Sequence, residues 1–524
     1  MANKTLFRSM VGRLLPKTDT LNEEGKPAYA FSAHHALAQY AATGCLNATF
    51  YASGEEQLDR VLDLCGRVEP EFIARAALYA RQKGFMKDLP ALLCAVLSVR
   101  SPGLLAEVFD RVIDSPKMLR NFVQIMRSGV VGRKSLGTLP KRLIVQWLQQ
   151  RSDEQLFAGS VGNDPSMADV IKMVHPKPAG ASRQALYGYL IGRPHDAEAL
   201  PEIVREYEKF KQDAAGARGP VPNVPFQMLM SLSLGRKEWT EIARNAPWQM
   251  TRMNLNTFGR HGVFESPDLV GLIARRLCDP ELVARARVFP YQLMIAYTAA
   301  SGMPPAIREA IQDAMEIACR NVPRIDGKVY VFPDISSSMH SPATGFRKGA
   351  TTAVRCIDVA ALVAATVLRK NRRAEVIPFE SDVVRVDLNP RDSVMTNAQR
   401  LASLPCGGTN CSAPLRHLNR CKATGDVVIY VSDNESWIDS PYYGHFGGGA
   451  TETMRQWAEF KRRSPAAKMI CIDIQPYGHT QAQERRDIVN VGGFSDQVFR
   501  LIAEVAAGGT EKDHWIRSIS AMRL

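Results

Sequence analysis

The run Val329-Tyr330-Val331-Phe332-Pro333-Asp334-Ile335-Ser336-Ser337-Ser338 decides the fold of the second part of the chain. It is an apolar, β-branched and aromatic stretch that ends in a carboxylate and a group of hydroxyls. Gly407-Gly408-Thr409 and the end of residues 428–433 provide two further polar loops. Carboxylate, hydroxyl and water oxygens are the ligands of a hard cation. The pattern predicts one divalent cation, with Mg²⁺ the first choice, held by Asp334, Ser336, Ser338, Thr409 and Asp433.

A serine-rich loop after a strand is usually a simple turn or a helix start, so the first motif alone is weak. The order of the three loops favours the metal site, because each closes a predicted strand or opens a predicted helix. Helical sequence follows the first loop over residues 348–370. Serine hydroxyls are neutral, so the ion would keep positive charge for an acidic ligand from outside. We therefore expect a binding site and not a sealed structural metal.

The second part of the chain alternates helical sequence with short β-rich runs, at residues 328–332, 374–379, 426–432 and 468–474. This alternation predicts βαβ units in a mostly parallel, doubly wound sheet, and we assign residues 326–524 to this α/β domain. Ligands of such sheets lie beyond the carboxyl ends of the strands. The predicted metal ligands fall at that edge.

We assign residues 1–325 to a first domain, in which the periodicity is helical almost throughout from about Ser32 to Asn321. Apolar residues recur three and four positions apart in segments with Gly, Pro and Ser at their boundaries, such as residues 56–67, 70–83, 89–99, 104–114 and 118–127. Many short helices with tight turns predict an all-α array of antiparallel pairs. No strict repeat length is found, so a HEAT-like solenoid is favoured over tetratricopeptide or ankyrin repeats.

Composition indicates a folded protein of more than one domain, with 524 residues, 45% hydrophobic and 23% charged. The formal charge of +13 is uneven. Residues 1–325 carry 41 Lys and Arg against 32 Asp and Glu, a net of +9, and residues 326–524 carry 25 against 21, a net of +4. A basic first part suggests a polyanionic partner, although diffuse basic charge often serves only solubility.

The ten cysteines are scattered singly without a Cys-x-x-Cys pair, so a zinc ribbon or a disulfide framework is not expected. They are typical of small core residues in a reducing compartment. The N-terminus lacks a continuous apolar signal segment, and the apolar runs are too short to span a membrane. We expect a cytoplasmic monomer with no membrane-embedded part.

Helical repeats followed by this metal-site domain resemble the Ro ribonucleoprotein family of bacterial type. Its helical part is the TROVE module, and its second part is a von Willebrand factor A domain with a metal-ion-dependent adhesion site. The predicted ligands match all five usual positions of that site. Other similar stretches occur in order: Ala48-Thr49-Phe50-Tyr51, residues 164–178 with a histidine and Lys-Pro at their end, and residues 286–291, 406–412 and 432–436.

The resemblance implies a ring of helical repeats closed by the metal-site domain. It also implies binding of small noncoding Y-like RNA and of single-stranded 3′ ends of misfolded or damaged RNA, in RNA quality control, with an exoribonuclease as a partner. One departure concerns a pair of basic residues that animal members carry just before the histidine segment. Residues 158–162 have no positive charge here. Y-RNA binding would therefore need other contacts.

The densest basic loop lies at residues 127–142, where glycines separate positive side chains. Arg and Lys match phosphate oxygens, and glycines let the backbone approach a ligand. The alternative is a solvated connection between helices. His175, followed by Lys177, could stack on a base or donate a hydrogen bond, although a histidine at a helix end is often a cap. The candidate RNA contacts are Arg127, Arg133, Lys134, Lys141, Arg142, His175 and Lys177.

A nuclease is the enzymatic alternative, because a hard cation and RNA occur together in many hydrolases. Two-metal hydrolysis needs clustered carboxylates, and here only Asp334 and Asp433 converge by motif, with no general base. We therefore predict no catalytic residues, no organic cofactor and no enzymatic activity. A third possibility is a protein-assembly scaffold, in which the metal captures a partner's acidic side chain and RNA is not bound.

Overall fold

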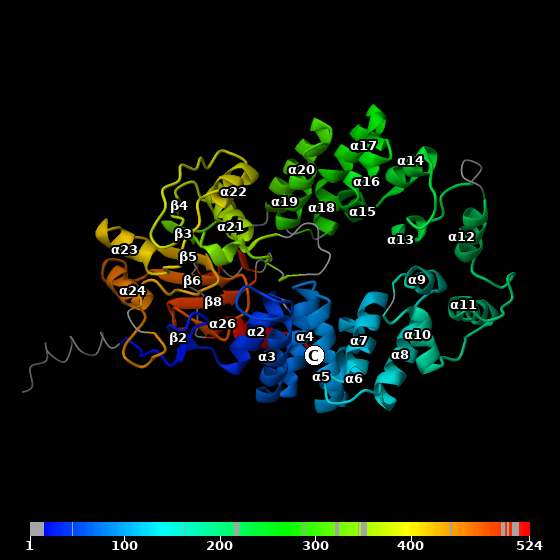
Figure 1. Ribbon diagram of the computed structural model, residues 1–524, viewed down its shortest axis with the longest axis horizontal. Helices are drawn as coiled ribbons and strands as arrows, with labels where there is room; N and C mark the ends of the chain where they lie inside the picture. Colours follow the sequence, from blue (N-terminus) through cyan, green and yellow to red (C-terminus); the bar gives the residue numbers. More distant parts are fainter. Residues whose placement is uncertain are drawn as a thin grey trace, which may run out of the picture. The chain divides into compact units, whose positions relative to one another are not determined.

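The computed structural model describes residues 15–43, 46–162, 164–213, 219–286, 288, 290–319, 324–343, 345–346, 354–440, 443–493, 498–499, 502, 504–505 and 513–524. The chain divides into two compact units (Figure 1). One comprises Met1–Val68 with Cys319–Ala521 and is called the α/β unit; the other comprises Glu69–Ala318 with Met522–Leu524 and is called the helical unit.

The α/β unit is built on a five-stranded parallel sheet of order β4-β3-β5-β6-β8. Its strands are β3 (Val329–Pro333), β4 (Glu375–Val376), β5 (Val427–Ser432), β6 (Lys468–Asp473) and β8 (Ile488–Gly492). The four predicted β-rich runs are confirmed, although the second forms only two strand residues. Strand β8 was missed, because a buried asparagine, Asn490, interrupts its short apolar run.

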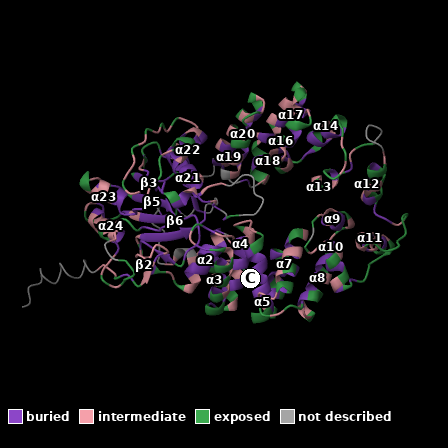
Figure 2. Ribbon diagram, viewed as in Figure 1, coloured by how far each residue is buried: buried purple, intermediate pink, exposed green. Residues whose placement is uncertain are grey.

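Helices cover both faces of this sheet, as expected for a doubly wound domain. They are η3 (Ser337–His340), α21 (Cys356–Lys370), α22 (Val394–Ala402), α23 (Ala413–Arg420), α24 (Glu452–Arg463) and α26 (His514–Ser520). Tyr330 and Phe332 join Trp457 and Phe460 in the buried cluster on one face. Strands covered on both faces have no polar side, which is why β3 and β5 are continuous apolar runs, buried throughout (Figure 2).

The described residues between Leu15 and Val68 belong to the α/β unit, which differs from the division at residue 325 predicted from the sequence. Strand β2 (Pro27–Ala30) pairs with β1 (Thr20–Leu21) and with β7 (His479–Thr480), and helices α2 (Ala33–Thr43) and α3 (Gly54–Arg67) follow. Helix α2 lies against the edge strand β8. A helix that covers an edge strand shields backbone groups that would otherwise be left unpaired. The helical periodicity of α2 predicts a helix but does not show which part of the fold the helix packs against.

The helical unit contains helices and connections, with no strand in its described residues. Its elements are α4 (Pro70–Gln82), α5 (Asp88–Arg100), α6 (Pro102–Val112), α7 (Pro116–Ser128), α8 (Thr138–Gln150), α9 (Asp153–Ala158), α10 (Met167–Val174), α11 (Ala181–Ile191), α12 (Glu202–Gln212), α13 (Phe226–Leu229), α14 (Arg236–Asn245), α15 (Trp248–Met253), α16 (Leu255–Arg260), η1 (Val263–Glu265), α17 (Pro267–Leu277), α18 (Pro280–Ala286), α19 (Pro290–Ala299) and α20 (Pro305–Ala318). Contacts run mainly between helices close in sequence, as in helical-repeat proteins.

The predicted fold class, an all-α repeat module plus a doubly wound α/β domain, is confirmed. Predicted helix boundaries fall within two residues of those observed, because the punctuation residues act as caps: Ser53 and Glu56 form a capping box, and α4, α6 and α7 each have a proline near the start. The predicted helix at residues 348–370 is seen from Cys356, and residues 347–353 lie outside the described part. None of the described helices has the length and apolar character needed to cross a membrane.

Candidate functional site

The predicted metal ligands lie on three loops at the carboxyl edge of the sheet. Asp334 follows β3 and Asp433 follows β5, and these two strands are paired so that Pro333 is opposite Val431. Backbone hydrogen bonds join the loops: the N–H of Ser337 donates to the oxygen of Gly407 at 2.9 Å, and the N–H of Trp437 donates to that of Thr409 at 3.1 Å. The structure thus brings all three loops together.

Asp334 is wholly buried, and its carboxylate accepts two short hydrogen bonds. The N–H of Ser336 donates to Oδ1 at 2.8 Å, and the hydroxyl of Ser432 donates to Oδ2 at 2.6 Å. Burial raises the pKa of Asp334 to about 6, against the lowering effect of these hydrogen bonds, and the charge of Glu380 raises it further. Its backbone and its orientation are therefore fixed before any ligand arrives.

Asp433 is buried beside Asp334, and its Oδ1 accepts a hydrogen bond from the N–H of Glu435 at 3.4 Å. The Ser338 and Ser336 hydroxyl oxygens are 3.2 Å apart. Burial raises the pKa of Asp433 well above its usual range, and the charge of Asp334 adds to the shift. Two buried carboxylates that repel each other raise the free energy of the folded state unless a positive charge lies between them.

The donor set fits a hard divalent cation. Thr409, like the serines, is buried at this edge, so hydroxyl oxygens accompany the two carboxylates. In the described part of the chain, no three His, Cys, Asp or Glu side chains converge as a metal cluster. A cation here would depend on hydroxyl and water oxygens, which suits Mg²⁺ better than zinc.

Glu380 is a carboxylate near the site that the motif search did not find. It follows the second predicted strand, and its carboxylate lies against Gly407, where a Cβ would force the Glu380 side chain to move. Its charge acts on Asp334. An acidic residue one position beyond the predicted strand at residues 374–379 was a usable signal, because carboxyl ends of parallel strands meet at one edge.

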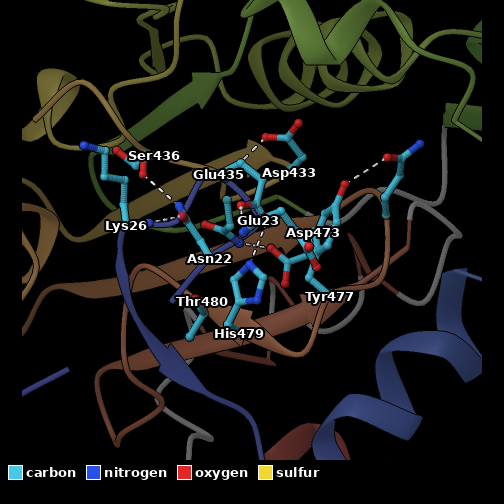
Figure 3. Close-up of polar contacts among 12 residues, drawn as sticks. Asn22, Glu23, Lys26, Asp433, Glu435, Ser436, Asp473, Tyr477, His479 and Thr480 are labelled. Carbon is cyan, nitrogen blue, oxygen red and sulfur yellow. Dashed lines mark hydrogen bonds and ion pairs between the residues drawn. The ribbon is translucent and has the colours of Figure 1, made fainter. Parts of the chain in front are cut away.

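A layer of buried polar groups lies next to the metal site and includes residues from the N-terminal segment (Figure 3). Figure 3 shows His479 pointing toward Glu435, with Nε2 and Oε1 2.6 Å apart. The second oxygen of Glu435 accepts the N–H of Glu23 at 2.9 Å, and Asn22 donates to the oxygen of Ser436 at 2.8 Å. These contacts tie the N-terminal strands to the loop that carries Asp433.

A second branch of the same layer is centred on Asp473, at the end of β6. Its carboxylate accepts hydrogen bonds from Asn434 and, at 3.0 Å, from Gln39 of α2. Burial raises the pKa of Asp473 well above its usual range. No local motif could have predicted this layer, because its partners lie between 39 and 434 residues apart in the sequence.

The candidate RNA contacts lie in the helical unit. The basic loop connects α7 to α8, and four of its five positive side chains are exposed: Arg127, Lys134, Lys141 and Arg142. Lys141 and Arg142 lie near the start of α8, where backbone N–H groups also favour an anion. Positive charge there opposes the helix dipole, so an anionic ligand would relieve an unfavourable arrangement.

Arg133 differs from the other residues of the loop. It is half-buried, its Nη2 donates to the oxygen of Leu136 at 2.7 Å, and its guanidinium lies against Gly137. Gly137 has a φ of 73°, a conformation that favours glycine. Arg133 therefore stabilises the loop conformation, whereas its neighbours present charge to solvent.

His175 ends α10 in the left-handed conformation, with a φ of 50°, and its N–H donates to the oxygen of Ile171 at 2.9 Å. The backbone of His175 therefore caps the C-terminus of α10, which is the alternative role considered from the sequence. The side chains of His175 and Lys177 are exposed. The structure places them in the helical unit with the basic loop and leaves their function open to experiment.

The sheet order and the polar loops at its carboxyl edge resemble those of a von Willebrand factor A domain. Residues 328–506 match the model of the Ro60 vWA domain. The chain is 22% identical over 548 aligned residues to a protein named RNA-binding protein RO60 from Deinococcus radiodurans, covering 96% of this chain and 99% of that protein. The resemblance to bacterial-type Ro proteins is therefore confirmed.

A solved structure agrees in fold. The crystal structure of the Deinococcus radiodurans RO (RSR) protein matches with a TM-score of 0.62 at 20% identity, covering 91% of this chain and all of that one. The likeness extends over both parts of the chain, so the combination of helical repeats and vWA domain is a shared fold.

Proposed function

We propose that this protein is an RNA-binding protein of Ro type, which takes up single-stranded 3′ ends of misfolded or damaged RNA and binds Y-like noncoding RNA. The observation that carries the proposal is similarity over nearly the whole chain to a protein named for RNA binding. The exposed basic loop at the start of α8 supports it, because it offers charge suited to phosphates.

The proposal includes a preference for free single-stranded ends. A hole lined by helical repeats, as the resemblance implies, would admit one strand but not an RNA duplex about 20 Å wide with its bases hidden. Such binding would tolerate many sequences and would suit quality control together with an exoribonuclease. The working form would be a cytoplasmic monomer.

The metal site would hold one Mg²⁺ through Asp334, Ser336, Ser338, Thr409 and Asp433. The ion would supply a positive centre with an open position for an acidic oxygen from outside. The buried, mutually repelling carboxylates support this assignment. We assign binding and not turnover, because hydrolysis of RNA would also need a general base aligned on the bound phosphate.

Equilibrium binding of the full chain to two RNAs tests the RNA part. One is a hairpin with a 3′ single-stranded tail, and the other is the same hairpin with a blunt end. We expect the tailed RNA to bind at least tenfold more tightly. Equal affinity for both would contradict the uptake of free ends, and RNA cleavage in Mg²⁺ would favour the nuclease alternative.

The scaffold alternative has one specific observation in its favour, since the metal site lies in a unit separate from the basic loop. Mg²⁺-dependent binding of an acidic protein, together with no affinity for either RNA, would establish the scaffold instead. Both functions could coexist on the same chain without sharing residues.

A further inference from the structure

A cavity of about 420 Å³ opens at the start of α24 in the α/β unit. Its walls include Thr18 and Pro27 of the N-terminal segment, residues between Asp439 and Glu452, and Gln481. The predicted metal ligands and the basic loop lie outside the set of described residues that line it. The volume is typical of a site for a small molecule, and the functions proposed above do not use the cavity.

Glycines form one wall of the cavity. Gly448 and Gly449 line it just before α24 begins. The N–H of Thr18 donates to the oxygen of Gly449 at 3.0 Å, which ties the N-terminal segment to this loop. Chain neighbours aside, no described heavy atom lies within 4 Å of the place that a Cβ of Gly448 would occupy. A ligand can therefore approach the backbone closely on this side.

Thr451 caps α24 at the cavity and joins the helix to Gln481. Its hydroxyl accepts the N–H of Met454 at 3.3 Å and donates to the backbone oxygen of Gln481 at 2.7 Å. The first N–H groups of a helix have no acceptor within the helix, and the N-terminus attracts negative charge. Because Thr451 and Glu452 line the cavity, this end of the helix favours an anion there.

The side chain of Gln481 independently indicates a ligand. Gln481 is only 4% exposed, and its amide nitrogen Nε2 has no hydrogen-bond partner in the described part of the chain. A buried donor without an acceptor raises the free energy of the folded state, and such groups are rare. Since Gln481 lines the cavity, an acceptor oxygen of a ligand would satisfy this donor.

Arg455 adds positive charge in the first turns of α24. It lines the cavity, its side chain is half exposed, and its Nη1 lies 3.4 Å from Oε2 of Glu452. A phosphate monoester presents three strong acceptor oxygens, enough for the helix N–H groups, the Gln481 amide and the Arg455 guanidinium. The fork of an arginine also matches phosphate geometry. The donors therefore favour a phosphate group.

The other walls suit the nucleoside part of such a ligand. Phe446 lines the cavity and is 55% exposed, and an aromatic ring of this kind can stack on a base. Asp439 accepts the hydroxyl of Ser436 at 2.9 Å, and its remaining lone pairs can accept sugar hydroxyls. Asp439 and Glu452 stand beside one arginine, so a chain of phosphates would be repelled where a single phosphate can be held.

We propose that this cavity binds a nucleoside monophosphate as a free small molecule. The phosphate would lie at the start of α24, against Gln481 and Arg455, and the base would stack on Phe446. The inference is independent of the proposed RNA and Mg²⁺ sites, because it shares no residue with either of them.

Titration calorimetry of the full chain with AMP, adenosine and inorganic phosphate tests the proposal. The buffer contains EDTA and no Mg²⁺, so that the proposed metal site cannot contribute to binding. We expect AMP to bind about tenfold more tightly than adenosine or phosphate, because only AMP offers both the phosphate and the base.

Arg455→Ala should weaken AMP binding about tenfold, and Phe446→Ser about fivefold. Arg462→Ala is the matched control and should leave the affinity unchanged. Arg462 also pairs with a glutamate three residues before it on α24, Glu459, at 2.6 Å, but it does not line the cavity. An equal loss in both arginine variants would show a general effect of charge and would overturn the phosphate position.

Gln481→Leu separates a ligand contact from a structural role. The change removes the unpartnered donor, so we expect about fivefold weaker AMP binding with an unchanged or higher melting temperature. Gln475→Leu is the contrast and should lower the melting temperature, because the buried amide of Gln475 donates to the oxygen of Pro342 at 3.0 Å. A lower melting temperature with unchanged AMP affinity in Gln481→Leu would make Gln481 structural and would overturn the proposal.

The remaining outcomes separate this inference from the proposed function. No binding of AMP at millimolar concentration would overturn the proposal, and so would equal affinity for AMP and adenosine. Displacement of AMP by single-stranded RNA would assign the cavity to RNA and would overturn the small-molecule site. A chain that binds AMP but neither RNA nor Mg²⁺ would support this inference and contradict the proposed function.

Discussion

The two units present their candidate ligand groups in opposite ways. In the α/β unit, Asp334 and Asp433 are buried, and a backbone N–H group donates to each carboxylate. In the helical unit, Lys134, Lys141 and Arg142 are exposed. A metal needs converging oxygens held in advance, whereas a polyanion needs charge that can reach it through water. Because of this difference in burial, a sequence motif can identify the metal ligands, whereas it cannot show which basic side chains are free to contact RNA.

The first prediction, which has the largest expected effect, is that Mg²⁺ binding can be abolished without loss of RNA affinity. Asp334→Ala should abolish Mg²⁺ binding, because it removes one of two carboxylates from the donor set. Affinity for a tailed RNA should stay within about twofold, because the predicted RNA contacts belong to the other unit. Titration calorimetry measures the first, and fluorescence anisotropy measures the second.

Asp326→Ala is the matched control, since it removes an exposed aspartate from the same unit. It should change neither quantity. A large loss of RNA affinity in Asp334→Ala, with a normal melting temperature, would show that the two sites are coupled.

Much of the α/β fold could be predicted, because a central strand that is buried on both faces of the sheet has a short, continuously apolar sequence. Residues 426–432 and 468–474 are recognisable for that reason, and strand-end polar residues then mark the site. The N-terminal segment could not be placed, since the sequence of α2 is simply that of one more helix next to the helical part of the chain. Its contact with β8 depends on Gln39 and Asp473, which are far apart in the sequence.

The metal ligands could be named from sequence because consecutive short motifs carry them. Glu435 and His479 could not, since their pairing is a product of the tertiary fold. In the basic loop, both Arg133 and Lys134 were predicted to contact RNA. In the structure, Arg133 instead donates a hydrogen bond to the oxygen of Leu136 within the loop. Residue type predicts possible chemistry, while burial decides which groups are free to perform it.

The second prediction tests whether the polar layer holds the N-terminal segment on the α/β unit. His479→Ala should lower the free energy of unfolding by about 3 kcal/mol, because it leaves Glu435 buried without its ion-pair partner. Calorimetric thermal unfolding measures the loss. A second change, Glu435→Gln, should restore part of the stability, and His445→Ala, at an exposed histidine, should be neutral.

A double variant that is as unstable as the sum of the single variants would show that the two side chains do not interact. The pair would then be independent of the anchoring of β2 and β7. Recovery in the double variant would show that the two side chains stabilise the fold as a pair.

The third prediction concerns the exposed charges of the basic loop. Changing Lys134, Lys141 and Arg142 together to alanine should lower the slope of log affinity against log salt by about two units, at roughly 0.7 unit for each phosphate contact of a single strand. Arg133→Ala should leave the slope unchanged, because its guanidinium is engaged with Leu136. An unchanged slope in the triple variant would show that the loop is merely solvated.

The last prediction returns to the N-terminal helix that packs on the sheet edge. His35 of α2 is buried, stacked on Phe31, with Nε2 3.2 Å from the oxygen of Asn490 in β8. Burial lowers its pKa to about 4, and the contact with Asn490 offsets this only in part. Between pH 4 and 6.5 the unfolded chain therefore binds more protons than the folded one, and stability must fall as the pH falls through that window.

At pH 5 this histidine should cost the α/β unit about 2 kcal/mol relative to pH 7. His35→Gln, which keeps a polar side chain but does not titrate, should show a correspondingly smaller loss in calorimetric unfolding at the two pH values. His175→Gln changes an exposed histidine of the helical unit and should keep the full acid loss. An equal loss of stability in His35→Gln and in the wild type would show that protonation of His35 does not weaken the packing of α2 against β8. The carboxylates of the polar layer would then be the groups to test.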